Sequence, residues 1–207
     1  MSQPSQCHRI DTCAIIALGS NVTSRHGSPK STINTAITSL NNDSLIVLAE
    51  SRLYSTPCMP IGAGPDYINA VVVITTGLSA SALLSELNRI EAEFDRQRTN
   101  RWAARTLDLD LIDYNGQIYP DANVYSKWRD LSVDLQAHTA PDQLILPHPR
   151  IQDRAFVLVP LCDVAPNWAH PVTGQTARQM LGALPLDDVA AVKPISAQAL
   201  VKTGTEE

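Results

Sequence analysis

The sequence lacks the glycine-rich loops through which many proteins hold phosphate groups. Neither a Walker loop (GxxxxGK[ST]) nor a GxGxxG fingerprint occurs in its 207 residues. Gly62-Ala-Gly64 lies in a stretch rich in proline and glycine, 55–65, and indicates only a turn. Any phosphate binding would therefore depend on side chains rather than on a backbone cradle.

Cysteine motifs and long apolar runs are also missing. The four cysteines, Cys7, Cys13, Cys58 and Cys162, show neither a CxxC nor a Cys/His metal spacing, as expected for reduced thiols. No apolar run approaches the ~20 residues of a membrane-spanning helix. The first residues lack the basic-then-apolar pattern of a signal peptide. We expect a cytoplasmic protein without a membrane partner.

Size and charge are those of an ordinary globular domain. The chain is 44% hydrophobic, and its formal net charge of −5 gives no reason to expect a nucleic-acid partner. No internal repeat is present. We expect one domain over residues 12–185, between a disordered N-terminal tail, 1–11, and a disordered C-terminal tail, 186–207.

Hydrophobic periodicity predicts an α+β fold. Expected strands are 13–18, 44–54, 67–75, the segment around Asp108 and Asp110, and 144–146; expected helices are 29–40, 79–94, 155–161 and 176–184. This order indicates a ferredoxin-like βαββαβ sandwich whose antiparallel-rich sheet is covered by helices. Asn115-Gly116 signals an added hairpin. Residues 120–142 form a long loop insertion, either a lid or a surface elaboration.

The most informative stretch is Arg101-Trp-Ala-Ala-Arg-Thr-Leu-Asp-Leu-Asp110. Side chains alternate along a strand, so Asp108 and Asp110 share one face while the leucines at 107, 109 and 111 share the other. Two carboxylates in this spacing can converge on one or two divalent cations. The segment is typical of a metal-binding strand.

Arginines precede these carboxylates in unusual number. Five of them, with no lysine, fall between positions 89 and 105: Arg89, Arg96, Arg98, Arg101 and Arg105. The guanidinium fork suits bidentate phosphate contact, whereas a solvated helix face would normally mix in lysine. Metal-binding carboxylates beside guanidinium groups are what polyphosphate chemistry requires.

Other residues admit two interpretations each. His148 lies between two prolines near Arg150 and Arg154, and is either structural or a phosphate contact. Tyr67 and Asn69 share a strand face, where they either bind a flat heterocycle or belong to the core. Gly19-Ser20-Asn21 is either an ordinary turn or a turn that presents amides to a ligand.

Taken together, these segments resemble the 6-hydroxymethyl-7,8-dihydropterin pyrophosphokinase family of folate biosynthesis. The matching motifs, in order, are Ala17-Leu-Gly-Ser-Asn21, Tyr54-Ser-Thr-Pro57, Asp66-Tyr-Ile-Asn-Ala70, Arg89-Ile-Glu91, Arg101 to Asp110, Pro147-His-Pro-Arg150 and Arg154-Ala-Phe156. The resemblance implies Mg²⁺-dependent transfer of pyrophosphate from ATP to the pterin hydroxymethyl group, with release of AMP. It implies a protein that acts on small molecules, and we expect a monomer.

The resemblance also implies a role for each matching residue. Asp108 and Asp110 would hold two Mg²⁺ ions. The catalytic residues would be Arg96, Arg98 and Arg105. ATP would contact Glu91, Arg96, Arg98, Trp102, Arg105, His148 and Arg154. The pterin would contact Thr56, Pro57, Tyr67, Asn69, Trp102 and Phe156.

The chain departs from the family pattern at Cys58, Asp95 and Ala103-Ala104, and none of these changes removes a metal ligand or an implied phosphate-binding arginine. Two other classes of function stay open. A two-metal phosphohydrolase would use the same aspartates without a pterin pocket. A non-catalytic binder would hold nucleotide or pterin without turnover.

Overall fold

The computed structural model describes residues 12–58, 62, 64–94, 106–132, 135 and 139–196. Its strands are β1 (Thr12–Ser20), β2 (Leu45–Glu50), β3 (Tyr54–Thr56), β4 (Tyr67–Thr76), β5 (Asp108–Tyr114) and β6 (Lys193–Pro194). They form one sheet in the order β5-β1-β4-β3-β6, with β2 also paired with β4. Every ladder among them is antiparallel. The α+β class with an antiparallel sheet is confirmed.

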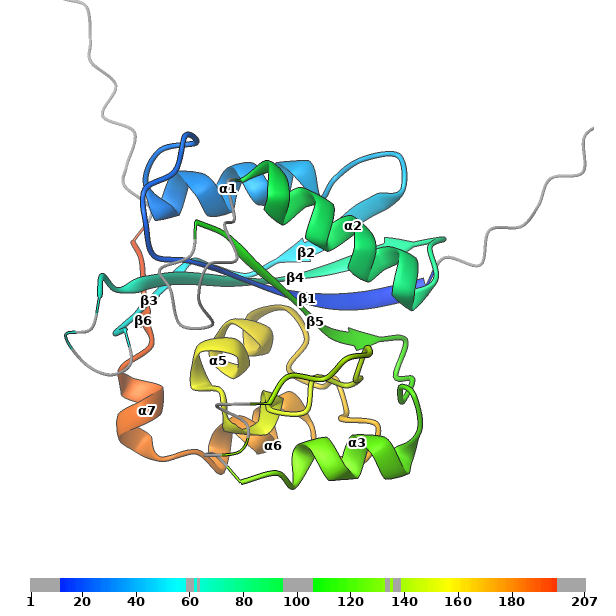
Figure 1. Ribbon diagram of the computed structural model, residues 1–207. Helices are drawn as coiled ribbons and strands as arrows, with labels where there is room; N and C mark the ends of the chain where they lie inside the picture. Colours follow the sequence, from blue (N-terminus) through cyan, green and yellow to red (C-terminus); the bar gives the residue numbers. More distant parts are fainter. Residues whose placement is uncertain are drawn as a thin grey trace, which may run out of the picture.

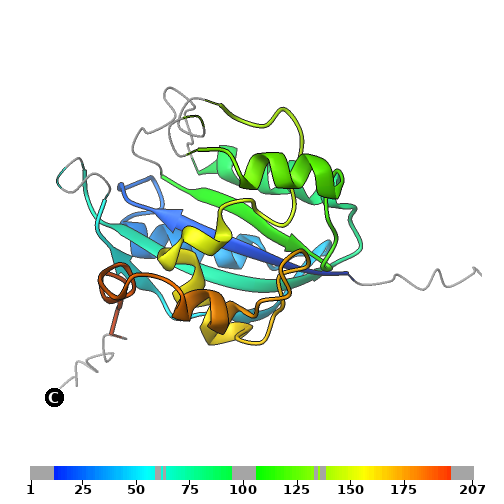
Figure 2. The ribbon, with the colours of Figure 1, turned by 90° about the horizontal axis from the view of Figure 1, so that it is seen from below.

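Helices lie on both sides of this sheet (Figure 1). On one side are α1 (Pro29–Ser39) and α2 (Ala80–Glu93). On the other are α3 (Ala122–Arg129), the 3-10 turn η1 (Ile151–Asp153), α5 (Ala155–Val164), α6 (Ala177–Gly182) and α7 (Leu186–Ala190). Figure 2, which views the molecule from below, shows α5 and α6 lying across this face of the sheet. None of the helices in the described ranges is long and apolar enough to cross a bilayer.

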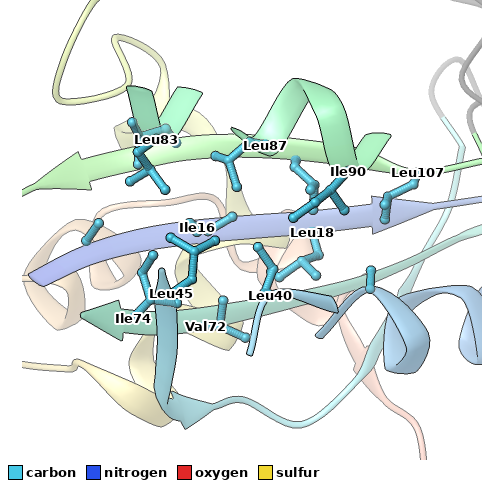
Figure 3. Packing of buried hydrophobic residues seen from close by; sticks show 14 of the residues in the cluster. Ile16, Leu18, Leu40, Leu45, Val72, Ile74, Leu83, Leu87, Ile90 and Leu107 are labelled. Atoms are coloured by element: carbon cyan, nitrogen blue, oxygen red, sulfur yellow. The ribbon is translucent and has the colours of Figure 1, made fainter. Parts of the chain in front are cut away.

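The central strand β1 is buried on both faces. Ile16 and Leu18 pack into the cluster formed with α1 and α2 (Figure 3). Ile15 and Ala17 point the other way, into the cluster formed with α5 and α6. Side chains alternate along a strand, so a strand between two helical layers needs apolar residues at every position. This explains the unbroken apolar run at 13–18.

Serine caps set the starts of the two helices on the first face. Ser79 Oγ accepts the Ala82 N–H at 3.3 Å, which confirms the predicted N-cap of α2. Ser28 caps α1 in the same way, with Pro29 in the first turn. The helix α2 ends at Phe94, its C-cap, as expected from its apolar stripe.

The turn after β5 forms, but it does not lead into a hairpin. Asn115 and Gly116 have positive φ angles of 53° and 65°, as a type I′ turn requires. The chain then leaves β5, and Tyr119 makes an isolated bridge with Leu146. The expected hairpin and the expected strand at 144–146 are therefore corrected to this single bridge. The residues of the turn determine its backbone conformation, but they do not determine which strand the following segment pairs with.

Part of the insertion 120–142 is helical. Asp121 Oδ1 accepts the N–H groups of Asn123 and Val124 and starts α3. Tyr125 on this helix is fully buried, and its hydroxyl lies 2.9 Å from His170 Nε2. This contact anchors α3 to the segment before α6, so the helix packs as part of the domain.

Residues 186–196 contradict the expectation of a disordered tail beyond 186. They form α7 and β6, and β6 pairs with Tyr54 and Ser55 of β3. The Ile195 N–H also donates to the Leu53 carbonyl oxygen at 2.8 Å. This pairing covers an edge of β3 that would otherwise present unpaired backbone groups.

The His170–Tyr125 contact predicts how stability depends on pH. Burial lowers the pKa of His170 to about 4, and the charge of Arg129 acts in the same direction. Between its ordinary pKa of 6.5 and about 4, the unfolded chain binds the proton and the folded chain does not. The contribution of neutral His170 to the free energy of unfolding is therefore fully present above pH 6.5, and it is lost as the pH falls toward 4.

We expect His170→Asn to flatten this dependence by at most about 3 kcal/mol, measured by urea unfolding between pH 7 and pH 4. His148 titrates in wild type and variant alike, so the difference between the two curves isolates His170. Parallel curves would show that His170 does not cause this loss.

Candidate active site

The two aspartates of β5 share one face, as predicted. Their side chains lie on the α5 side, whereas Leu107, Leu109 and Leu111 are buried in the core on the α1 and α2 side. The neighbouring positions on β1 are Gly19 opposite Asp108 and Ala17 opposite Asp110. Small residues on the central strand therefore leave space beside both carboxylates.

Glu91 supports the strand that carries these aspartates. Its side chain is 2% exposed, and its Oε1 accepts the Leu109 N–H at 2.7 Å. That N–H lies between the two aspartates in the sequence. Glu91 thus fixes the backbone of β5. The contact with the nucleoside that the resemblance implied for Glu91 stays a prediction.

Replacing Glu91 with alanine is expected to lower the free energy of unfolding by about 1–3 kcal/mol, because the Leu109 N–H loses its buried acceptor. Glu91→Gln keeps a carbonyl acceptor and should lose less. Glu86→Ala on the same helix removes only a partly exposed ion pair with Arg89 and should cost within about 1 kcal/mol. Urea unfolding of the three variants measures the difference, and equal losses at Glu91 and Glu86 would contradict it.

A basic residue, Arg154, lies next to the carboxylates. Arg154 Nη1 is 3.0 Å from Asp110 Oδ2, and its guanidinium lies over the Phe156 ring at 5.6 Å from the centroid. Arg154 is the N-cap residue of α5, so the positive end of that helix dipole also points to this place. The arrangement favours a bound anion beside Asp110.

His148 is held next to β5 as a neutral ring. Its backbone N–H donates to the Ile112 carbonyl oxygen at 2.8 Å. Its Nδ1 accepts the Arg150 N–H at 3.1 Å, which leaves the hydrogen on Nε2. Burial of the ring, reinforced by the charge of Arg154, lowers the pKa of His148 well below 6.5. His148 can therefore donate a hydrogen bond without carrying a charge.

A polar surface lies across β1 from the carboxylates. Asn69 is 5% exposed, and its Nδ2 donates to Thr56 Oγ1 at 2.8 Å. Tyr67 shares the same face of β4, two residues earlier. Pro57 follows β3 and is exposed, and Phe156 in the first turn of α5 is 39% exposed. The expected substrate contacts in the described ranges thus come from β3, β4 and α5.

Gly19 joins the two halves of the site. In the sheet register it pairs with Asn69 on β4 and with Asp108 on β5. A Cβ atom at this position would lie 3.3 Å from Asn69 Oδ1 and 3.9 Å from Tyr67 Cδ1. From the sequence, Gly19 was expected in a turn, either an ordinary one or one that presents amides to a ligand, whereas the structure places it within β1. The signal that could have found it is a glycine at the end of a buried strand, which often marks close approach of a ligand or backbone.

The rest of the Gly19-Ser20-Asn21 motif is also accounted for. Gly19 and Ser20 belong to β1, and Asn21 follows the strand, with its side chain 3% exposed. Asn21 Nδ2 donates to the Pro65 carbonyl oxygen at 3.2 Å, which ties the end of β1 to the loop before β4.

The only arginine of the 89–105 cluster within the described residues is Arg89. It pairs with Glu86 at 2.8 Å and with Glu93 on its own helix, so the solvated helix face is the correct reading for this residue. Arg96, Arg98, Arg101, Trp102 and Arg105 lie outside the described residues, as do Asp95 and Ala103-Ala104. In the sequence they connect Phe94, at the end of α2, to Thr106 before β5.

A cavity of about 320 Å³ lies next to this site, between the end of β3 and α7. Its lining residues are Ser55, Pro57, Asp66, Asp187, Ala190, Ala191 and Lys193. None of the aspartates of β5 and neither Asn69 nor Tyr67 lines it. Of the expected substrate contacts, Pro57 is shared with this cavity, so the cavity borders the candidate site at the end of β3.

The side chains present fit a magnesium ion bound together with a ligand. Within the described ranges no group of three or more His, Cys, Asp or Glu residues could hold a metal ion. Mg²⁺ is typically held by one or two carboxylates, with water and substrate phosphates completing its shell. Asp108 and Asp110, next to Arg154, provide that set of ligands.

Fold and site together define an α+β protein in which the strand β1 separates a carboxylate pair suited to Mg²⁺ from a polar, aromatic surface. The family model for 7,8-dihydro-6-hydroxymethylpterin-pyrophosphokinase (HPPK) matches residues 15–166. The chain belongs to this family.

Relatives and a solved structure agree with this assignment. The chain is 35% identical over 196 residues to the 2-amino-4-hydroxy-6-hydroxymethyldihydropteridine pyrophosphokinase of Synechocystis sp., covering 93% of this chain and 83% of the relative. It is 36% identical over 162 residues to the enzyme of the same name from Haemophilus influenzae, covering 76% and 84%. A crystal structure of Plasmodium falciparum HPPK-DHPS shares the fold, with a TM-score of 0.56 and 16% identity. That match covers 83% of this chain and 43% of the longer Plasmodium chain.

Proposed function

We propose that this chain transfers the β,γ-pyrophosphoryl group of ATP to the hydroxymethyl oxygen of 6-hydroxymethyl-7,8-dihydropterin in a Mg²⁺-dependent reaction, a step of tetrahydrofolate biosynthesis. The hydroxymethyl oxygen forms a bond to the β-phosphorus and loses its proton. The bond between that phosphorus and the α,β-bridging oxygen breaks, and AMP leaves. The products are the pterin diphosphate and AMP.

The observation that carries the proposal is the position of Gly19. Gly19 on β1 pairs with both Asn69 and Asp108, so these two residues lie on the strands that flank β1, on one face of the sheet. A heterocycle bound at Asn69 would therefore direct its substituent toward the carboxylate side. Reactions of this kind depend on positioning and electrostatic stabilisation, because no covalent nucleophile is needed.

On the pterin side, each residue has a distinct part. Asn69 donates one amide hydrogen to Thr56, which holds the amide in place; its second hydrogen and its Oδ1 serve the edge of the ring. Tyr67 and Phe156 offer aromatic faces for stacking. Thr56 and Pro57 line the pocket, and the sequence motif adds Trp102.

On the phosphate side, Asp108 and Asp110 hold Mg²⁺. When bound, the ion neutralises charge on the phosphates and orients them for in-line displacement. Arg154 and the neutral Nε2–H of His148 donate to phosphate oxygens. Arg96, Arg98 and Arg105, assigned from the sequence motif, add positive charge as it is needed in the transition state. Glu91 acts through β5.

Product analysis tests this proposal. The purified protein is incubated with ATP and Mg²⁺, with and without the hydroxymethyl pterin, and AMP is measured. We expect AMP only when the pterin is present, in equal amount to the pterin diphosphate. Release of phosphate without pterin would indicate a phosphohydrolase instead, and binding of both ligands without turnover would indicate a non-catalytic binder.

We also infer the ferredoxin-like arrangement of the sheet, which the strand order β5-β1-β4 with β2 beside β4 supports. Small molecules as the partners follow from the proposed reaction. The monomeric state and the cytoplasmic location stay predictions from the sequence.

A further inference from the structure

A carboxylate on α5 holds the start of β3. Asp163, in the last turn of α5, accepts a hydrogen bond from the Tyr54 hydroxyl, which lies 2.8 Å from its Oδ2. The Arg52 guanidinium donates two more bonds to the same carboxylate, at 2.7 Å to Oδ1 and 3.1 Å to Oδ2. The Arg52 backbone N–H also donates to Oδ2, at 3.2 Å. Asp163 thus joins the end of α5 to both the side chains and the backbone that lead into β3.

The charge and burial of this group show which of its bonds matters most. Burial alone would raise the pKa of Asp163, but the hydrogen bonds from Arg52 and Tyr54 outweigh it and lower the pKa. Asp163 is therefore ionised at neutral pH, and bonds to a charged acceptor are stronger than bonds between neutral groups. The Arg52 side chain is 65% exposed, so water screens its ion pair. Tyr54 is only 2% exposed, and its hydroxyl is the sheltered partner.

The strand β3 depends on such an anchor because it is short. It consists of the three residues Tyr54–Thr56, so its ladder with β4 contains few backbone hydrogen bonds. In that ladder Tyr54 lies opposite Asn69, and Thr56 lies opposite Tyr67. Thr56 Oγ1 also accepts the hydrogen bond from the Asn69 amide. A displacement of Tyr54 would therefore displace Thr56 and release the Asn69 side chain.

The helix that carries Asp163 also carries Phe156. The two residues are seven positions apart on α5, which places them on the same face of the helix. At the start of that helix, Ala155 shares a buried cluster with the Tyr54 ring. The contact between Asp163 and Tyr54 therefore fixes β3 relative to the helix that presents the exposed Phe156 ring.

We propose that Asp163 is a positioning residue for the pterin. Through the Tyr54 hydroxyl it holds β3 against α5, and so it sets the spacing between the Thr56–Asn69 pair and the Phe156 ring. This inference rests on the proposed function, because it takes Thr56, Asn69 and Phe156 as pterin contacts. It goes beyond that function in giving a role to a carboxylate and a tyrosine that the proposed reaction does not use.

The test compares Tyr54→Phe and Asp163→Ala with the wild type in the full chain. Tyr54→Phe removes the hydroxyl and keeps the buried ring. The measured quantities are the Kd for 6-hydroxymethyl-7,8-dihydropterin, the Kd for MgATP and the midpoint of thermal unfolding. We expect Tyr54→Phe to weaken pterin binding about threefold to tenfold, and Asp163→Ala to weaken it at least as much, because binding must then order β3. The Kd for MgATP should change by less than about twofold.

Two further variants separate positioning from general stability. Tyr114→Phe is the matched control, because Tyr114 is 7% exposed and its hydroxyl donates to the Leu78 carbonyl oxygen at 2.7 Å. It should lower the midpoint of thermal unfolding about as much as Tyr54→Phe does, with an unchanged Kd for pterin. The double variant Tyr54→Phe/Asp163→Ala should bind pterin no more weakly than Asp163→Ala, because both changes remove the same contact.

Wild-type affinity for pterin in Tyr54→Phe and Asp163→Ala would overturn the inference. Equal losses of pterin and MgATP affinity would also overturn it, as would an equal loss of pterin affinity in Tyr114→Phe, since these results indicate a general loss of stability. If the wild type binds pterin but forms no AMP, the proposed function fails, and the pterin affinities of the variants still decide the inference. A wild type that binds no pterin would overturn both.

Discussion

Asp110→Ala is expected to abolish turnover while pterin binding changes only slightly. Asp110 shares a strand face with Asp108, and its Oδ2 contacts Arg154 at 3.0 Å. Loss of one of the two carboxylates proposed to bind Mg²⁺ should remove several kilocalories per mole of transition-state stabilisation, or roughly a thousandfold in kcat. The proposed pterin contacts lie across Gly19, on β4 and β3, so they should stay in place. Steady-state AMP formation and pterin titration measure the two effects.

Two further variants test whether the loss of turnover is due to the charge of Asp110. Asp110→Asn keeps the shape and a hydrogen-bond acceptor for Arg154 but removes the charge, and it should be nearly as inactive as alanine. Asp130→Ala removes an exposed carboxylate of α3 that pairs with Arg129, and it should retain full activity. An Asp110→Ala variant as active as wild type would refute the metal-binding role.

Asn69→Ala should weaken pterin binding about a hundredfold and leave the affinity for MgATP nearly unchanged. A buried amide that pairs with a ligand edge contributes about 1–3 kcal/mol, and its loss also frees the Thr56 hydroxyl that now accepts its hydrogen bond at 2.8 Å. Isothermal titration with pterin and with MgATP separates the two affinities.

Asn123→Ala is the matched control, because Asn123 is an exposed asparagine on α3. It should bind both ligands as the wild type does. Thermal unfolding shows whether Asn69→Ala is folded at the temperature of the titration. A folded Asn69→Ala protein with unchanged pterin affinity would contradict the pocket on β4.

The face shared by Asp108 and Asp110 could be predicted, since alternation along a strand depends only on local geometry. The Ser79 cap and the left-handed turn at Asn115-Gly116 were predictable for the same reason. In each case, the residues that decide the structure lie within a few positions of one another.

Contacts between distant segments could not be predicted in this way. The hydrogen bond from the Leu109 N–H to Glu91 could not be predicted, because only the packing of α2 on β5 brings the two residues near. Lys193–Pro194 is a strand only because β3 offers it an open edge. The role of Gly19 in the site depends on the strand register, which places it between Asn69 and Asp108.

In the proposed reaction, the pterin-binding and metal-binding residues meet at Gly19 and together transfer pyrophosphate. ATP labelled at the β-phosphorus tests it most directly, in the presence of Mg²⁺ and the hydroxymethyl pterin. We expect all transferred label in the pterin diphosphate, with unlabelled AMP formed in equal amount. Label in ADP, or in free phosphate formed without pterin, would contradict the account.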